Sequence, residues 1–275
     1  LMIQKAQKQD LKIWLSPEIE MSPIAVKQFV QEDLASNWQQ NFSTLYSEFI
    51  IYSADLANYM NIEGVIYPTD VLHLYKFQNY ATLSEMVTST TLSNIDNIKN
   101  RFPNKIFISL NGSQLSDNTI LSAVDGFVIE PQLDFVESEY VAENYESTFA
   151  SYLENEIFAT YSEYDKQILI GLNFPSVKGV ERGCIMAEEV CYDFDIINKL
   201  DSNIVAKSFE VDLINQVNLD HAAFNAINEA EWIDGVISQE YNPQVAIMDI
   251  SSSVRGKPAN GVFWYWFPRM LGITN

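Results

Sequence analysis

The sequence is poor in positive charge. It carries 16 Lys and Arg residues against 37 Asp and Glu residues, so its formal net charge is −21. Nucleic acids and anionic membranes are bound by cationic surfaces, and the composition therefore excludes both as expected partners. We interpret the excess of acidic residues as a contribution to solubility, in preference to an acidic binding function.

Cysteine, histidine and long apolar runs are also scarce. The two cysteines, Cys184 and Cys191, could form a disulfide in an oxidising compartment or remain free thiols. With only two histidines, His73 and His221, a structural zinc site is not expected, and we expect no other metal or cofactor. No stretch of about 18 consecutive apolar residues occurs, so membrane insertion is not expected either.

The composition is typical of a folded globular chain. Hydrophobic residues make up 47% of the 275 residues, which is enough for a sizeable core. The first ten residues lack the basic and then apolar order of a signal peptide and look like a helix within a domain. We find no linker and no internal repeat, so the sequence predicts a single domain over residues 1–275.

Short apolar runs alternate with helical patterns along the chain. We expect strands near 12–15, 65–68, 105–110, 126–129, 168–172 and 232–237. Helices are expected near 44–60, 83–99, 142–161 and 212–227; the first has apolar residues at Leu45, Phe49, Tyr52, Leu56 and Met60. Such alternation predicts parallel βαβ units.

The number of expected strands is two short of a closed barrel, which has eight. The sequence therefore predicts an α/β fold of the TIM (β/α)8 barrel class that lacks the first two strands in this chain. The alternative is an open six-stranded sheet. In a β/α barrel, residues at the carboxyl ends of the strands carry the chemistry. Here the run 65–70 ends in Asp70, whereas the run 168–173 ends in Gly171, Leu172 and Asn173.

An ordered set of segments resembles glycoside hydrolase family 113, a group of β-mannanase-like barrels. The set covers nearly the whole chain. In chain order it comprises Ile3-x-x-Ala6 followed by residues 11–17, residues 46–57 followed by residues 66–70, Phe174-Pro175-Ser176, Val211-Asp212-x-x-x-Gln216, and Arg255-Gly256-Lys257-Pro258-Ala259. The resemblance implies that the chain begins at the helix before the third barrel strand. It also implies a scaffold built to bind and hydrolyse β-mannosides.

The sequence departs from the family pattern at the positions that carry the chemistry. By this resemblance Asp70 stands where the family has its acid/base glutamate, and Gly171 stands where the family has its nucleophilic glutamate. Glu18 replaces an expected histidine, and Glu130 replaces an aromatic signature. Asp is shorter than Glu by one methylene, so a proton donor at this position would be withdrawn by roughly 1 Å. Such a displacement can slow the catalysed reaction on the order of a hundredfold.

Other acidic residues at strand ends could form a relocated catalytic pair. Asp70 could act with Glu130 or Glu240 across the barrel mouth, with room for a water molecule between the carboxylates, as inverting hydrolysis requires. The alternative is that these acids, together with Glu18 and Glu20, cap helices or lie on solvated loops.

Aromatic and amide side chains at strand ends are the candidate substrate-binding groups. Tyr67 and Phe174 could stack on the apolar faces of sugars, and we add Asn111, Asn173 and Glu18 as polar contacts. The carboxylates with the two asparagines could also hold Ca²⁺ or Mg²⁺, but no acidic loop of the EF-hand kind supports this. The aromatic cluster at 263–267 is expected to pack in the core.

Three functions remain open from the sequence. The first is a catalytically degenerate barrel that binds carbohydrate or has a structural role at the cell surface or outside the cell. The second is an active glycosidase with Asp70 as general acid and a relocated second carboxylate. The third is an architectural module that assembles with other chains.

Overall fold

The computed structural model describes residues 2–19, 36–69, 81–112, 118–131, 133, 142–187, 190–192, 194–198, 209–239, 241 and 249–273. The chain divides into two compact units. The first comprises Leu1–Leu110 with Gln114–Val128, and the second comprises Asn111–Ser113 with Ile129–Asn275. The division runs through two β-strands, between Leu110 and Asn111 and between Val128 and Ile129. The expectation of one domain stays a prediction.

The main sheet has the strand order of a β/α barrel. Its six strands are hydrogen-bonded in the order β1 (Trp14–Leu15), β2 (Gly64–Tyr67), β3 (Lys105–Asn111), β4 (Gly126–Glu130), β5 (Gln167–Leu172) and β8 (Gly235–Ser238). The pairs β1–β2, β2–β3 and β5–β8 are parallel. Sequential strands that lie side by side and run parallel are the TIM-barrel arrangement, so the predicted fold class is confirmed.

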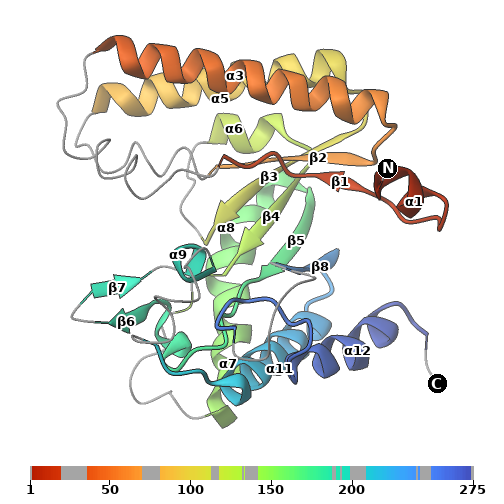
Figure 1. Ribbon diagram of the computed structural model, residues 1–275, viewed down its shortest axis with the longest axis vertical. Helices are drawn as coiled ribbons and strands as arrows, with labels where there is room; N and C mark the ends of the chain where they lie inside the picture. Colours follow the sequence, from red (N-terminus) through yellow and green to blue (C-terminus); the bar gives the residue numbers. More distant parts are fainter. Residues whose placement is uncertain are drawn as a thin grey trace. The chain divides into compact units, whose positions relative to one another are not determined.

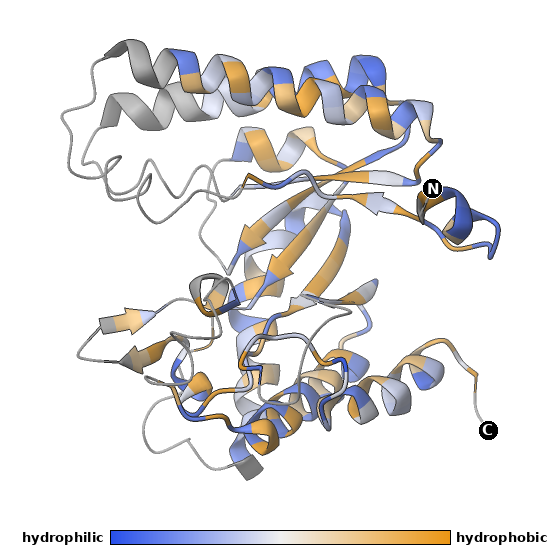
Figure 2. Ribbon diagram, in the orientation of Figure 1, coloured by the Kyte–Doolittle hydropathy of each residue, from blue (hydrophilic) through white to orange (hydrophobic). Residues whose placement is uncertain are grey.

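Apolar residues are concentrated along the central strands (Figure 2). Four consecutive residues of β4 and most of β3 and β5 are buried. Strands that are buried on both faces carry nearly continuous apolar runs, and these runs are what the sequence analysis could recognise.

The first unit carries helices α1 (Met2–Gln7), α3 (Ser36–Tyr59), α5 (Ala81–Arg101) and α6 (Asn118–Ala123). Helices α3 and α5 lie side by side (Figure 1). The apolar stripe predicted for α3 is correct only in part. Phe49, Leu56 and Met60 are half-buried, whereas Leu45 and Tyr52 are exposed. The fully buried residues of this helix include Tyr46, Ile50, Ala54 and Ala57. The Tyr46 hydroxyl donates to the Pro68 carbonyl oxygen at 3.3 Å, and the small alanines allow the helix to pack closely.

The second unit carries most of the remaining elements. These are α7 (Ala142–Tyr152), the π-helix η2 (Leu153–Phe158), α8 (Ala159–Tyr161), η3 (Ser162–Tyr164), η4 (Val180–Arg182), β6 (Ile185–Ala187), β7 (Val190–Tyr192), α9 (Phe194–Asn198), α11 (Leu213–Glu229) and α12 (Ala259–Met270). Helix α11 packs against both α7 and α12 (Figure 1). Asp212 caps α11, because its carboxylate accepts the backbone N–H of Asn215 at 2.9 Å.

Strands β6 and β7 form an antiparallel hairpin in a segment where the sequence analysis expects neither a strand nor a helix. Each strand has three residues, which is too short to show an alternating pattern. The structure joins Cys184 to Cys191 by a disulfide, with their Cα atoms 5.6 Å apart. The pairing that the sequence left open is therefore present, and it ties the hairpin together.

Two features near the C-terminal end differ from the sequence prediction, namely the start of the last strand and the burial of the aromatic cluster. The last strand begins at Gly235 rather than at Trp232, because Ile233 N–H donates to the Ala230 carbonyl oxygen at 3.0 Å in a turn. The aromatic cluster lies on α12 and is only partly in the core. Phe263 and Trp266 are buried, whereas Trp264 is 75% exposed.

Candidate functional site

Glu130 is the centre of a polar network at the carboxyl ends of three strands. It is the last residue of β4, Asn173 directly follows β5, and Gln239 directly follows β8. Gln239 Nε2 donates to Glu130 Oε1 at 2.7 Å, and Asn173 Nδ2 donates to Glu130 Oε2 at 3.3 Å. Each oxygen of this carboxylate therefore accepts a hydrogen bond from a side-chain amide.

The network continues from Asn173 to two residues in later parts of the chain. Asn173 Oδ1 accepts hydrogen bonds from Asn198 Nδ2 at 2.9 Å and from the Ser252 hydroxyl. Asn198 Oδ1 in turn accepts the backbone N–H of Ser252 at 2.8 Å. We refer to these five side chains, Glu130, Asn173, Asn198, Gln239 and Ser252, as the Glu130 network.

Gly171 lies beside this network on β5. A Cβ atom built on Gly171 would lie 3.0 Å from Gln239 Nε2 and 3.1 Å from Glu130 Cγ. The side chains of Glu130 and Gln239 thus fill the space into which a larger residue at 171 would extend. This is the position at which the resemblance places the nucleophilic glutamate of the hydrolases.

The arrangement is suited to hydrogen bonding. A carboxylate oxygen accepts hydrogen bonds, and the neighbouring side-chain amides donate them. Asparagine, glutamine and serine add further donors and acceptors, which match the hydroxyl groups of a polar ligand. Glu130, Asn198 and Gln239 are partly exposed, whereas Asn173 and Ser252 are buried.

The other predicted substrate-binding residues do not share one environment. Asn111 is the half-buried last residue of β3. Phe174 follows Asn173 directly but is 4% exposed, and its ring packs edge-on against Phe149 with centroids 6.4 Å apart. The buried Phe174 ring is therefore not accessible in this structure for the sugar stacking that was predicted for it.

The substrate-binding residues predicted in the first unit are Glu18 and Tyr67. Tyr67 is 1% exposed, and its hydroxyl accepts a hydrogen bond from Asn94 Nδ2 at 3.2 Å, so its ring also serves packing. Glu18 is exposed. Asp70 and Glu240, which the sequence analysis proposed as catalytic residues, lie outside the described residues. The relocated pair therefore stays a prediction.

A buried lysine holds the segment that delivers Ser252 to the Glu130 network. Lys257 Nζ donates to the Ser251 carbonyl oxygen at 2.6 Å, to Ser176 Oγ at 2.9 Å and to Asp249 Oδ1 at 3.2 Å. The Lys257 side chain is fully buried. The ammonium group thus connects the segment after β5 to the segment that precedes α12.

Three of the sequence segments that carry the family resemblance meet at this lysine. Lys257 contacts Ser176, and the backbone N–H of Asp212 donates to the Ser176 carbonyl oxygen at 3.0 Å. Gln216 Nε2 donates to the Phe174 carbonyl oxygen at 2.8 Å and to the Ser252 carbonyl oxygen at 3.3 Å. These segments, which are separate in the sequence, form one support behind the end of β5.

Burial shifts the pKa of two ionisable groups in this support. Burial lowers the pKa of Lys257, and the carboxylate of Asp249 opposes that shift. Burial raises the pKa of the fully buried Asp220 well above its ordinary value of 3.8, and the Lys257 charge opposes that shift. Asp220 Oδ2 has no hydrogen-bond partner among the described residues.

The raised pKa of Asp220 predicts a pH dependence of stability. A group whose pKa is higher in the folded state binds more protons when the protein is folded. Its contribution to the free energy of unfolding is therefore fully present below pH 3.8 and is lost as the pH rises through the folded-state pKa. We expect the free energy of unfolding to fall with rising pH in the wild type, relative to Asp220→Asn. Urea unfolding at a series of pH values measures this, with the exposed Asp96→Asn as the matched control. Parallel profiles for the wild type and Asp220→Asn would contradict it.

The described residues also bear on metal binding and on membrane insertion. Within those residues there is no group of three or more His, Cys, Asp or Glu side chains that could hold a metal ion. Among the same residues, each helix is too short or too polar to cross a bilayer.

Comparison with known proteins gives matches in structure only. No protein-family model matches the sequence, and no curated protein sequence matches it. A GH113 β-1,4-mannanase matches with a TM-score of 0.64 and 16% identity, over 96% of this chain and 76% of that chain. The GH113 β-mannanase AaManA from Alicyclobacillus acidocaldarius, in complex with ManMIm, matches with a TM-score of 0.62 and 16% identity, over 99% of this chain and 77% of that chain.

A GH2 β-galacturonidase from Eisenbergiella tayi matches less well, with a TM-score of 0.53 and 11% identity, over 99% of this chain and 42% of that chain. At such identities a structural likeness establishes the fold alone. The chain therefore has a TIM-barrel-type fold like that of the GH113 β-mannanases.

Proposed function

We propose that this protein is a catalytically degenerate, glycoside-hydrolase-like barrel that binds carbohydrate without hydrolysing it. The observation that carries the proposal is the filled space beside Gly171. Hydrolysis of the usual kind needs two carboxylates that face each other across the scissile bond. At the end of β5 this chain has a glycine, and Glu130 and Gln239 occupy the adjacent space.

The Glu130 network supplies the groups that would contact a sugar. Its partly exposed members are a carboxylate and two amides, and together they can accept and donate hydrogen bonds to vicinal hydroxyl groups. Their mutual hydrogen bonds hold them in place before a ligand arrives, which reduces the entropy lost on binding. Because the structural neighbours include β-mannanases, we propose β-mannosides as the first ligand class to test.

The Cys184–Cys191 disulfide supports a location on the cell surface or outside the cell. Disulfides persist in oxidising compartments and are rare in the cytosol. We therefore include the extracellular location in the proposal.

An active glycosidase is the second candidate, because Glu130 does place a carboxylate at a strand end. In that case Asp70 would act as general acid and Glu130 or Glu240 as its partner. The two amide hydrogen bonds on Glu130 hold its carboxylate in place, and a carboxylate oxygen can accept a second hydrogen bond, such as one from a ligand hydroxyl group, which favours the binding role.

Calorimetric titration with manno-oligosaccharides and a panel of other oligosaccharides tests the binding. We expect the wild type to bind at least one ligand, and Gln239→Ala and Glu130→Gln to weaken that binding about tenfold or more, because each removes a hydrogen bond that involves a charged group. Glu210→Gln is the matched control, since Glu210 lies on the surface in an exposed ion pair with Lys178.

Two results would overturn the proposal. One is a wild type that binds none of the oligosaccharides. The other is binding that Gln239→Ala and Glu130→Gln leave unchanged, because the ligand would then sit away from the Glu130 network.

A further inference from the structure

Gln216 and Asp220 form a buried polar pair on helix α11. They are four residues apart, so their side chains lie on the same face of the helix. Gln216 is 0% exposed and Asp220 is 2% exposed. Gln216 Oε1 and Asp220 Oδ2 have no hydrogen-bond partner among the described residues. Buried polar atoms are nearly always hydrogen-bonded in folded proteins, so this pair needs an explanation.

The orientation of the Gln216 side-chain amide is fixed by its other contacts. Its Nε2 atom donates to the Phe174 carbonyl oxygen at 2.8 Å and to the Ser252 carbonyl oxygen at 3.3 Å. Carbonyl oxygens only accept hydrogen bonds, so the NH2 group of the amide must face them and Oε1 must point to the other side. Gln216 Oε1 is an acceptor, and it needs a donor from another group.

Lys257 carries the charge that acts on Asp220, but its protons are engaged elsewhere. An ammonium group has three donors. Those of Lys257 are directed at the Ser251 carbonyl oxygen, at Ser176 Oγ and at Asp249 Oδ1. The ammonium group therefore has no donor left for the carboxyl group of Asp220.

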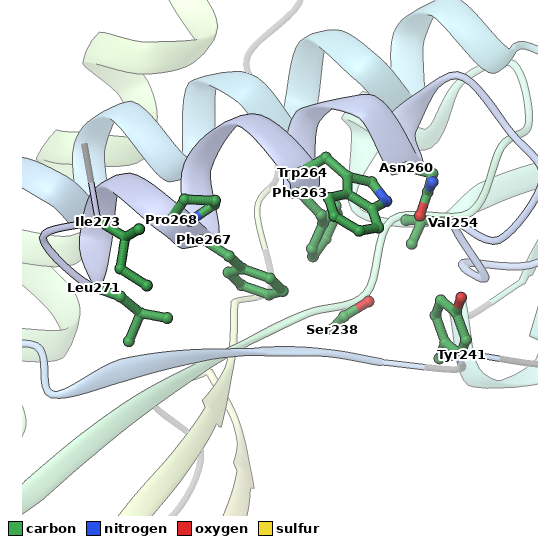
Figure 3. Close-up of a pocket in the computed structure, with 10 residues that line it drawn as sticks. All are labelled: Ser238, Tyr241, Val254, Asn260, Phe263, Trp264, Phe267, Pro268, Leu271 and Ile273. Atoms are coloured by element: carbon green, nitrogen blue, oxygen red, sulfur yellow. The ribbon is translucent and has the colours of Figure 1, made fainter. Parts of the chain in front are cut away.

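The backbone around Lys257 holds this arrangement in place. The Lys257 N–H donates to the Val254 carbonyl oxygen at 3.1 Å, and the Asn260 N–H donates to the Lys257 carbonyl oxygen at 3.1 Å. Val254 and Asn260 are labelled in Figure 3, where Asn260 lies on α12. A turn that is fixed on both sides of Lys257 keeps its ammonium group on the acceptors that it already has.

The other groups packed around α11 do not neutralise Asp220. Helices α7 and α12 and the short helix η4 all contact α11. Among the described residues, Lys257 is the only charged group that acts on the pKa of Asp220. The neighbouring His221 is exposed, and its ring contacts Tyr265 and Trp266 on α12. An ionised Asp220 would thus be a buried charge without a hydrogen-bonded counter-ion, which is costly.

A proton on Asp220 resolves both problems. A protonated carboxyl group donates one O–H hydrogen bond, and Gln216 Oε1 is an acceptor one helical turn away. Burial favours this neutral form, because it raises the pKa of Asp220 well above its ordinary value of 3.8. We propose that Asp220 and Gln216 form a proton-dependent switch, in which the protonated Asp220 donates to Gln216 Oε1 and thereby holds the Gln216 amide against the Ser252 segment.

The switch acts on the Glu130 network through Ser252. Gln216 holds the Ser252 carbonyl oxygen, and the Ser252 hydroxyl donates to Asn173 Oδ1 within that network. An ionised Asp220 cannot donate, and it would place a second acceptor beside Gln216 Oε1. We therefore expect the Glu130 network to loosen as the pH rises through the folded-state pKa of Asp220. The expectation that carbohydrate affinity falls with it rests on the proposed function.

Infrared spectroscopy tests for the proton without any ligand. At about pH 6 a carboxyl group with the ordinary pKa is ionised. The wild type should nevertheless show the C=O stretching band of a buried protonated carboxylic acid, and Asp220→Asn should lack it. If the two spectra agree in this region, Asp220 is ionised, a water molecule or another group supplies the donor, and the inference is overturned.

Hydrogen exchange at the Ser252 amide tests the link to the Glu130 network. The amide of Asp220→Asn can donate to Gln216 Oε1 at every pH, so this variant is the reference. The exchange rate of the wild type divided by that of Asp220→Asn should be about one at low pH and should rise about tenfold as the pH increases. The control is the Asn61 amide, which donates to the Asn58 carbonyl oxygen at 3.0 Å in an exposed turn of the first unit. Its ratio should stay constant.

Three results would overturn the switch. The first is a Ser252 ratio that does not change with pH. The second is an equal change at Asn61, because the effect would then not be local. The third is an oligosaccharide that the wild type and Asp220→Asn bind with a pH-independent ratio of affinities. The infrared and exchange measurements need no carbohydrate, so a failure of the proposed function to bind one is distinguishable from a failure of the switch.

Discussion

Replacing Lys257 by methionine should lower the free energy of unfolding by about 3 kcal/mol. The Lys257 side chain is fully buried, and its ammonium group donates to Ser176, to Asp249 and to the Ser251 carbonyl oxygen. Methionine keeps most of the volume but leaves these acceptors without their donor. Asp249 is 35% exposed, so most of the cost comes from Ser176 and the Ser251 carbonyl oxygen, which are buried and lose a charged donor.

Lys178→Met is the matched control for this prediction. Lys178 also forms an ion pair, with Glu210 at 2.9 Å, but both side chains are largely exposed, at 66% and 71%. Exposed pairs of this kind contribute about 0–1 kcal/mol. Urea unfolding of both variants measures the difference. Equal losses of stability would contradict the structural role assigned to Lys257.

Replacing Lys257 by methionine should also weaken the Glu130 network. Lys257 holds the Ser251 carbonyl oxygen, and the next residue, Ser252, donates to Asn173. Faster hydrogen exchange at the Ser252 amide than in the wild type would report the loosening directly, since that amide donates to Asn198 in the folded protein.

Replacing Gly171 by glutamate should destabilise the protein by about 3 kcal/mol. The Cβ atom alone would lie 3.0 Å from Gln239 Nε2 and 3.1 Å from Glu130 Cγ, so both side chains would have to move. The new carboxylate would also lie close to that of Glu130, and two like charges at short range repel each other. Gly171→Ala should cost less, about 1 kcal/mol, because it adds only the Cβ contact.

Gly261→Ala is the control for the glycine series. Gly261 lies within α12, and a Cβ atom there would meet no heavy atom within 4 Å. Alanine in a helix is more stable than glycine by roughly 0.5–1 kcal/mol, so this variant should be slightly stabilised. If Gly171→Glu proved as stable as the wild type, the space at the end of β5 would be free to accept a carboxylate.

The sequence was sufficient for the strand order because buried parallel strands are short, continuous apolar runs. It was insufficient where burial depends on which side of a helix meets its neighbour. On α3 the apolar residues Leu45 and Tyr52 suggested the buried face, but the small residues Ala54 and Ala57 and the hydrogen-bonded Tyr46 form it.

Part of the candidate site was also accessible from the sequence. Glu130 and Asn173 were found because each stands at the end of a recognisable strand, and Gln239 was missed because Glu240 next to it drew attention as an acid. Asn198 and Ser252 join the network from α9 and from the segment before α12, far from Asn173 in sequence. Such contacts depend on tertiary structure, so no spacing in the sequence indicates them.

Hydrolysis assays on β-mannosides and other glycosides test the central claim most directly. The wild type and Asp70→Asn should be compared under the same conditions, with an active β-mannanase as the positive control. The absence of an opposing carboxylate at Gly171 predicts no turnover by either protein. Turnover by the wild type that Asp70→Asn abolishes would contradict the account, because it would show that a catalytic pair persists in this barrel.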